Sequence, residues 1–375
     1  MSEPWQPLLG LRVVDFSMFV PGPFASAILA DLGAEVIKVE APRGDPGRSY
    51  VPVQFRMENR NKRSLALDLK SPASKPIVER LAARSDIAIE GFRPGVAKRL
   101  KIDFQTLSTF NSRLIYCSIS GYGQTGPWRG RPGHDVNYVA AAGALAFSGQ
   151  WLKAPVRSSL PLADMGGGAF AAIAVLAALQ ERNATGKGVS LDLSLFESAF
   201  FWAAMRHGLD PKADPRAHIF PVNDVFETAD GKRLTLGILE EHFWENFLKA
   251  APELRDERFA TDALRRRHGD EVSSRLEKIM KGRTAAQWLE LLERHDVPVD
   301  LCVTPGEAKE LPHLKEREAV AGEFVPFPVW ANGRRGARIR SGVPAPGEHS
   351  REILVELGFD DGEIAQLRKT GSVPS

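Results

Sequence analysis

The stretch LRVVDFSMFVPGPFASAILADLGAEVIKVE, residues 11–40, decides the fold. Its pattern predicts a strand over residues 11–17, a helix over 23–34 that ends at Gly33, and a second strand over 35–40. A strand, a helix and a strand of these lengths form a βαβ unit. The stretch therefore indicates an α/β protein with a mostly parallel sheet that is covered on both faces.

The same alternation continues along the chain. Residues 64–69 predict a strand, 75–85 a helix, 86–92 a strand and 113–123 another buried strand that ends in a glycine turn. Residues 164–182 are apolar on nearly every side, which is typical of a buried helix. Because ligands of such sheets bind beyond the carboxyl ends of the strands, we expect the site there.

A change of pattern near residue 206 indicates a second domain. The loop 206–218 is rich in Pro, Asp and basic residues, and residues 226–237 predict a hairpin followed by amphipathic helices. We expect a large domain whose first part spans 1–210, a smaller α+β domain over 211–322, and a C-terminal segment, 323–375, that returns to the large domain.

Composition excludes several classes of protein. The chain has 375 residues, 43% of them hydrophobic and 26% charged, and its formal net charge is +2. This balance favours a globular protein and argues against an obligate nucleic-acid binder.

The start shows no secretory leader, and no run approaches the roughly 18 apolar residues of a membrane span, so we expect a cytoplasmic protein without a membrane partner. Cys117 and Cys302 are expected to be buried structural thiols.

Three acidic or imidazole side chains are candidates for catalysis. Asp164 precedes three glycines at the start of the apolar helix; it is either a helix cap above closely packed glycines or a carboxylate beside a ligand. His134 lies in a glycine loop, where it is either a surface residue or a general acid and base, and Asp135 either tunes it or caps a helix. Glu240 is either another carboxylate at a helix start or a catalytic partner.

Basic residues near predicted strand ends are candidates for binding phosphates: Lys62, Arg63, Arg93 and Arg99. Solvated surface cations are the alternative. The chain has no Walker A loop, no GxGxxG after the first strand, no HExxH and no GxSxG. These absences argue against a nicotinamide dinucleotide, a catalytic metal and a serine nucleophile elbow.

Seven segments together resemble the family III CoA transferases (CaiB/BaiF) and their racemase relatives, most closely the α-methylacyl-CoA racemase branch. They follow the family order from residue 8 to about 358. The segments are residues 8–48, NKRSLALDLKSP at 61–72, EGFRPGVAKRL at 90–100, GYGQTGPW at 121–128, GHDVNY at 133–138, ADMGGG at 163–168, and PAPGEHSREILVELG at 344–358.

The resemblance implies a Rossmann-like large domain, a smaller inserted domain, and an interlaced homodimer that acts on an acyl-CoA, with no cofactor or metal beyond the CoA of the substrate. Many members have an arginine directly after the second strand, where this chain has Ala41, and Arg43 is expected to substitute. The CoA surface is expected to include Arg43, Lys62, Leu65, Ala66, Leu67, Gly91, Phe92, Arg93 and Arg99.

The resemblance also implies two reactions. In the racemase branch His134 and Asp164 move a proton at the carbon alpha to the thioester, Asp135 and Glu240 tune or orient His134, and backbone amides at Asp164 and Met165 stabilise the enolate. In the transferase branch Asp164 is the nucleophile that forms an anhydride and then an enzyme CoA thioester. His134 favours the racemase reaction. A scaffold that binds CoA without chemistry is a further alternative.

Overall fold

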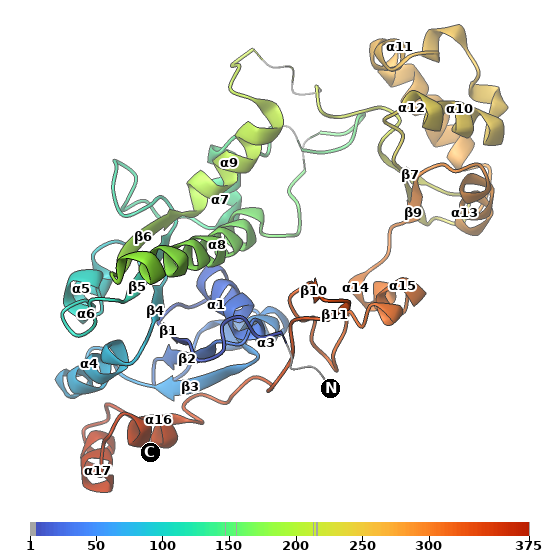
Figure 1. Ribbon diagram of the computed structural model, residues 1–375. Coiled ribbons are helices and arrows are strands. Elements are labelled where there is room, and N and C mark those ends of the chain that lie inside the picture. Colours follow the sequence, from blue (N-terminus) through green and yellow to red (C-terminus); the bar gives the residue numbers. More distant parts are fainter. Residues whose placement is uncertain (1–4, 147, 155, 213, 215–216, 375) are drawn as a thin grey trace. The chain divides into compact units, whose positions relative to one another are not determined.

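The computed structural model describes residues 5–146, 148–154, 156–212, 214 and 217–374 (Figure 1). The chain forms two compact units. Unit 1 contains residues 1–142, 160–201 and 312–375, and unit 2 contains residues 143–159 and 202–311. The sequence analysis placed the boundaries at 210/211 and 322/323. Residues 143–159 belong to unit 2 because Trp151 there donates through its ring nitrogen to Asp270 and through its amide to Asp224.

Unit 1 is built on a six-stranded parallel sheet with the strand order β3-β2-β1-β4-β5-β6. This confirms the α/β fold with a parallel sheet. The order runs outward from β1 in both directions, so the chain crosses the sheet after β3. The strands are β1 (Arg12–Asp15), β2 (Glu35–Glu40), β3 (Lys62–Ala66), β4 (Ile87–Glu90), β5 (Ile115–Ser120) and β6 (Val189–Ser194).

Helices surround this sheet, and the C-terminal residues extend the core beside β3. The His349 amide donates to the Ser64 carbonyl, and Ile353, Leu354 and Leu357 join the buried cluster around Leu65. The helices of unit 1 are α1 (Pro21–Asp31), α2 (Gly47–Tyr50), α3 (Pro52–Asn59), α4 (Lys75–Ala83), α5 (Val96–Leu100), α6 (Phe104–Leu107), α7 (Asp135–Ala141), α8 (Leu162–Thr185), α15 (Pro312–Glu316), α16 (Ser350–Glu356) and α17 (Asp361–Lys369), with a short hairpin of β10 (Trp330–Ala331) and β11 (Arg334–Arg335).

Unit 2 has its own core and a three-stranded antiparallel sheet, which confirms the smaller α+β part. Trp244, Phe247 and Trp288 are fully buried in this core. The predicted hairpin at 226–237 is present as β7 (Val225–Glu227) and β8 (Arg233–Leu236), and β9 (Val299–Leu301) pairs beside β8. The helices are α10 (Glu241–Ala250), α11 (Asp262–Arg267), α12 (Gly269–Met280), α13 (Ala285–Arg294) and α14 (Pro305–Ala308); α9 (Leu195–His207) connects the two units.

Helix α8 packs along α1, and two of its glycines permit close approach, one to α1 and the other to Leu195 at the start of α9. A Cβ atom at Gly168 would lie 2.6 Å from the Pro21 carbonyl oxygen, and one at Gly167 would lie 2.4 Å from a Leu195 methyl group. By length and composition alone, α8 could cross a membrane, with a mean hydropathy of 1.8 over 18 residues. The expectation that no segment qualifies was therefore too strict. Half of that window is buried against the rest of unit 1, as in a core helix.

Candidate active site

Asp164 lies in the first turn of α8, beside the first turn of α7 in unit 1. Helix α8 begins two residues earlier than the sequence predicted, at Leu162. The Asp164 side chain is half-buried. Burial, and secondly the negative charge of Asp135, raise the pKa of Asp164 to about 7. A carboxyl group with this pKa can accept or return a proton near neutral pH, which is what a general base of a reversible proton transfer requires.

Asp135 connects the two helix starts. Its carboxylate Oδ1 accepts hydrogen bonds from the backbone amides of Ala163, at 2.7 Å, and Asp164, at 3.3 Å. Asp135 is buried and is itself the first residue of α7, so it fastens the His134 segment to the start of α8. The sequence analysis left open whether Asp135 caps a helix or tunes His134. The structure shows that its carboxylate caps the start of α8, and its action on His134 stays a prediction.

The expected enolate donors are already occupied. The Asp164 amide donates to Asp135 as described, and the Met165 amide donates to the Pro161 carbonyl oxygen at 2.9 Å. The reason is that α8 begins before Asp164, so the Met165 amide already lies within the hydrogen-bonded first turn. The expectation that these two amides stabilise an enolate oxygen is therefore corrected.

His134 is the residue that precedes α7, and its side chain is exposed. Its backbone is fixed because the His134 amide donates to the Asn137 side chain at 3.0 Å, while the Asn137 amide donates back to the His134 carbonyl at 2.8 Å. The Tyr138 hydroxyl donates to the Gly133 carbonyl at 2.6 Å and so fixes the residue before His134 to α7. The backbone of His134 is thus held in place while its imidazole remains accessible.

Glu240 belongs to unit 2, where it precedes α10 and is exposed. Its carbonyl accepts the Phe243 and Trp244 amides, and its side chain makes no capping hydrogen bond. Glu240 is therefore a carboxylate at a helix start, as one interpretation of the sequence expected, but its side chain does not cap the helix. Its expected action on His134 stays a prediction.

Replacing Asp135 by Asn tests the effect of its negative charge on the pKa of Asp164. Asn keeps an oxygen that can accept the Ala163 and Asp164 amides but removes the charge. We therefore expect the pKa of Asp164 to fall from about 7, and the acid limb of the rate against pH to move to lower pH. The measurement is the pH dependence of kcat/KM. Asp135→Ala is the control, because it also removes the cap and should cost about 1 kcal/mol of stability; an acid limb that stays in place in Asp135→Asn would contradict the assignment.

A first cavity of about 200 Å³ opens beyond the carboxyl ends of four strands of unit 1. It is lined by Phe16 to Met18 after β1, by Val39 to Ala41 at the end of β2, by Leu67 to Lys70 after β3, and by Phe92 after β4. Its position is the one that the parallel sheet predicts for a ligand. The mostly apolar wall suits an uncharged, flexible part of a ligand.

A second, adjoining cavity of about 1060 Å³ shares Leu69, Lys70, Phe92 and Leu100 with the first. Cations predominate in its lining over the two carboxylates, Glu79 and Asp103. Such a surface suits a polyanion, and phosphate groups above all. The basic residues are Lys70, Lys75, Lys98, Arg99 and Lys101.

The structure separates the residues expected at the CoA surface into three groups. Leu67, Phe92 and Arg99 line the two cavities. Arg43, Gly91 and Arg93 are exposed next to cavity residues in the sequence. Leu65 and Ala66 are fully buried, so their side chains belong to the core. The sequence analysis missed Lys70, Lys75, Lys98 and Lys101, although the cations at residues 98–101 are a signal that could have been used.

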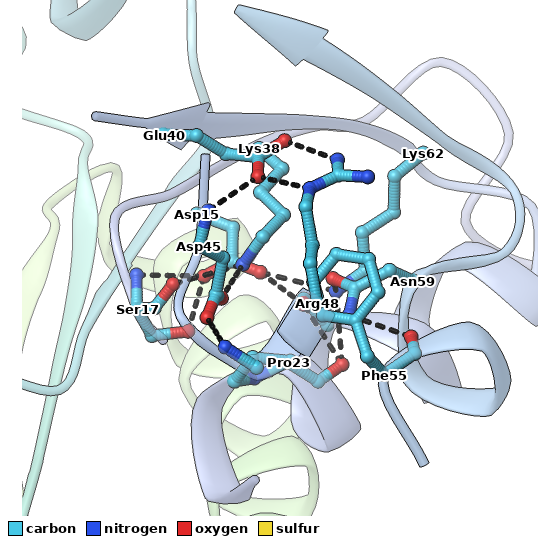
Figure 2. A network of polar contacts seen from close by, with 12 residues as sticks. Asp15, Ser17, Pro23, Lys38, Glu40, Asp45, Arg48, Phe55, Asn59 and Lys62 are labelled. Atoms are coloured by element: carbon cyan, nitrogen blue, oxygen red, sulfur yellow. Dashed lines mark hydrogen bonds and ion pairs between the residues drawn. The ribbon is translucent and has the colours of Figure 1, made fainter. Parts of the chain in front are cut away.

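The expectation that Lys62 belongs to the CoA surface is wrong. Its ammonium is fully buried and donates to Asp15 at 3.2 Å, the Pro23 carbonyl at 3.0 Å and Asn59 at 3.0 Å (Figure 2). Lys38 is buried beside it and binds Asp45 at 2.9 Å. All three donors of the Lys62 ammonium are used inside the protein, so none is left for a phosphate. Lys62 stabilises the junction of β1, β3, α1 and α3 instead.

Removing the cations of the second cavity should weaken CoA binding. For Lys98→Ala combined with Lys101→Ala, we expect the Kd for CoA to rise by up to about fivefold per charge, because both side chains are exposed to solvent. Calorimetric titration at low and high salt measures this, and the loss should shrink at high salt. Lys187→Ala, another exposed lysine outside this cavity, is the control; equal Kd values for both variants would refute a phosphate-binding role.

Comparisons with known proteins all point to one protein family. A family model described as CoA-transferase family III matches residues 8–350. The human α-methylacyl-CoA racemase is 33% identical over 388 residues, covering 98% of each chain. The acetyl-CoA:oxalate CoA-transferase of Acetobacter aceti is also 33% identical, covering 96% of this chain and 98% of its own. The crystal structure of a CaiB/BaiF family protein from Brucella suis superposes with a TM-score of 0.82 at 28% identity, covering 95% of this chain and all of that chain.

Proposed function

Because the chain belongs to the family III CoA transferases, whose members include racemases as well as transferases, we propose that it epimerises the alpha carbon of a 2-methyl-branched or similar acyl-CoA. The reaction is a 1,1-proton transfer through an enolate. His134 and Asp164 are the two catalytic residues.

The observation that carries this proposal is the connection of Asp164 to the His134 segment through Asp135. Inversion requires one group to remove the alpha proton from one face and a second group to return a proton to the other face. Asp164, with a pKa of about 7, suits one of these roles. His134, next to Asp135 in sequence, supplies the second group, since an imidazole has one nitrogen that can accept a proton and one that can donate a proton.

The two steps balance in protons and electrons. In one direction Asp164 takes the alpha proton, the C–H electron pair moves into the enolate, and the His134 imidazolium returns a proton to the opposite face. The reverse direction uses the same groups with their roles exchanged. The acyl-CoA is the only small molecule that the reaction needs, and the proposal retains the expectation of a cytoplasmic enzyme without metal or nucleic-acid partners.

The cavities of unit 1 are assigned to the CoA part of the substrate. The basic second cavity receives the phosphates, and the apolar first cavity receives the pantetheine chain. Leu67 and Phe92 then contact the chain, while Arg99 contacts phosphate, with Arg43, Gly91 and Arg93 at the rim.

Loss of optical purity tests the proposal. A single enantiomer of a 2-methylacyl-CoA is incubated with the purified protein in the absence of any carboxylate acceptor. We expect conversion to a near-equal mixture of both enantiomers, which chiral separation of the released acid measures. An unchanged enantiomer, with CoA binding demonstrated in the same sample, would refute epimerisation.

Acyl-CoA:carboxylate CoA transfer is the second candidate, favoured by the transferases among the relatives at 30 to 33% identity. Asp164 would then attack the thioester carbonyl, release CoA and form an anhydride. The residue is partly exposed to solvent, as an attacking group requires. Trapping of an adduct at Asp164 with hydroxylamine during turnover would favour this reaction.

We also propose that the enzyme is an interlaced homodimer, as the resemblance implies. Large apolar side chains are exposed along α9 in the single chain, and a partner chain would cover them. Sedimentation equilibrium tests this assembly: a mass of one chain would refute it. The exposed side chains are Phe200, Phe201, Trp202 and Met205.

A further inference from the structure

Tyr138 is a buried phenol of α7 whose hydroxyl is directed at the backbone of the loop before His134. Only 6% of the residue is exposed, and the hydroxyl donates to the Gly133 carbonyl at 2.6 Å. The ring makes an edge-to-face contact with the ring of Tyr122, with 5.2 Å between the two centroids. A Phe at this position would supply the same apolar contacts, so the hydroxyl adds one specific contact, the hydrogen bond to the loop.

The Gly133–His134 peptide group is held at both of its polar atoms. Its carbonyl oxygen accepts the Tyr138 hydroxyl, and its N–H donates to the Asn137 side chain at 3.0 Å. This peptide group is planar and is bonded directly to the Cα of His134. The next residue, Asp135, is the first of α7, so His134 is held on both sides of its Cα. The imidazole is thereby placed, apart from the rotations of its own side chain.

Two glycines make room for the Tyr138 ring. A Cβ atom at Gly133 would lie 2.7 Å from Cε1 of Tyr138, and one at Gly121 would lie 2.5 Å from its hydroxyl oxygen. Gly121 directly follows β5, and its carbonyl accepts the amide of Phe196, at the start of α9, at 2.9 Å. The ring therefore packs against the His134 loop and also against a backbone segment that is anchored at the end of the sheet.

We propose that Tyr138 is a positioning residue for His134: its ring packs on Gly121 and Gly133, and its hydroxyl holds the Gly133–His134 peptide so that the imidazole stays where a proton is transferred. This inference rests on the proposed role of His134 in catalysis. Proton transfer requires the two groups to lie within hydrogen-bond distance, and a displacement of about 1 Å can lower a rate about 10²-fold. Tyr138 itself exchanges no proton with the substrate and acts through His134 alone.

Tyr138→Phe tests the hydrogen bond, because it keeps the ring. We expect kcat for epimerisation to fall about tenfold, the factor that corresponds to one neutral hydrogen bond. KM and the Kd for CoA should stay within about twofold, because Tyr138 lines neither cavity assigned to CoA. Tyr122→Phe is the matched control, since its hydroxyl is also buried but has no hydrogen-bond partner among the described residues. An unchanged kcat in Tyr138→Phe, or an equal loss in both variants, would overturn the inference.

Substitution of the glycines displaces the same ring without changing Tyr138. Gly133→Ala and Gly121→Ala each introduce a methyl group that the ring must give way to, so both should lower kcat as Tyr138→Phe does. Gly130→Ala is the control in the same loop, because a Cβ atom there meets no heavy atom of the described chain within 4 Å beyond its immediate neighbours. If Gly130→Ala lowers kcat as much as Gly133→Ala, the loss arises from the loop and the inference fails.

Amide hydrogen exchange separates this inference from the proposed function, because it needs no substrate. In Tyr138→Phe the peptide before His134 should loosen, and the His134 amide should exchange at least about tenfold faster than in the wild type. The Ala163 amide, which Asp135 holds, should exchange at the wild-type rate. An unchanged rate at His134 overturns the inference even if the enzyme epimerises its substrate. A faster rate in a protein that epimerises nothing refutes the proposed function alone, and the hold of Tyr138 on His134 stands.

Discussion

The Asp164→Asn variant is expected to epimerise acyl-CoA at least about 10³-fold more slowly than the wild type. The amide cannot take the alpha proton, and a positioned general base typically contributes 10²- to 10⁴-fold. His134→Ala should lose a comparable factor, because inversion needs both groups. The measurement is the initial rate of enantiomer conversion at saturating substrate.

CoA binding is the control for these two variants. Neither side chain lines the two cavities assigned to CoA, so the Kd for CoA should stay within about twofold of the wild type. Combining both substitutions should cost little more than either alone, since the groups act in one reaction. A variant of Asp164 that retains wild-type epimerisation would remove this residue from the mechanism.

The largest expected effect on stability is that of Lys62→Met. Although burial alone would raise the pKa of Asp15, Lys62 and Lys38 together hold it below its usual value. Removing Lys62 leaves the fully buried Asp15 carboxylate with one cation fewer and leaves the Pro23 carbonyl without that donor. Breaking a buried pair in this way costs about 3 to 5 kcal/mol. Denaturant unfolding measures the loss.

The double variant Lys62→Met with Asp15→Asn checks the cause. Because it removes the uncompensated charge as well, it should be more stable than Lys62→Met alone. Ser17 donates to Oδ1 of Asp15 and Ser26 donates to Oδ2, so the single oxygen of Asn can keep one of these two acceptor positions. If Lys62→Met unfolds at the same denaturant concentration as the wild type, the network does not stabilise the fold as described.

The sequence predicted the sheet well because local patterns determine its strands. The helix expected at 23–34 is α1, which begins two residues earlier because Pro21 suits the first turn. The helix ends at Asp31, two residues before the expected end at Gly33, and Gly33 follows it with a φ of 111° that suits a helix stop. The assignment of residues 143–159 to unit 2 was not predictable, because the contacts of Trp151 that hold them lie 73 and 119 residues away.

The sequence predicted only those site residues that their residue type and a motif identify. His134, Asp135 and Asp164 were identified from the sequence, and Asp135 brings the last of them beside α7. The phosphate-binding role expected for Lys62 was wrong because the side chain is buried. A cation at a strand end is normally solvated, but Lys62 pairs with Asp15, which is distant in the sequence.

Deuterium uptake at the alpha carbon tests the central claim most directly. A single enantiomer of a 2-methylacyl-CoA is incubated with the protein in D₂O, with and without an added carboxylate, and the alpha position is followed by NMR. Proton transfer predicts deuterium at that carbon in both samples, with loss of optical purity, and neither in Asp164→Asn. CoA passing to the added carboxylate while the alpha carbon keeps its proton would contradict the account and assign Asp164 as a nucleophile.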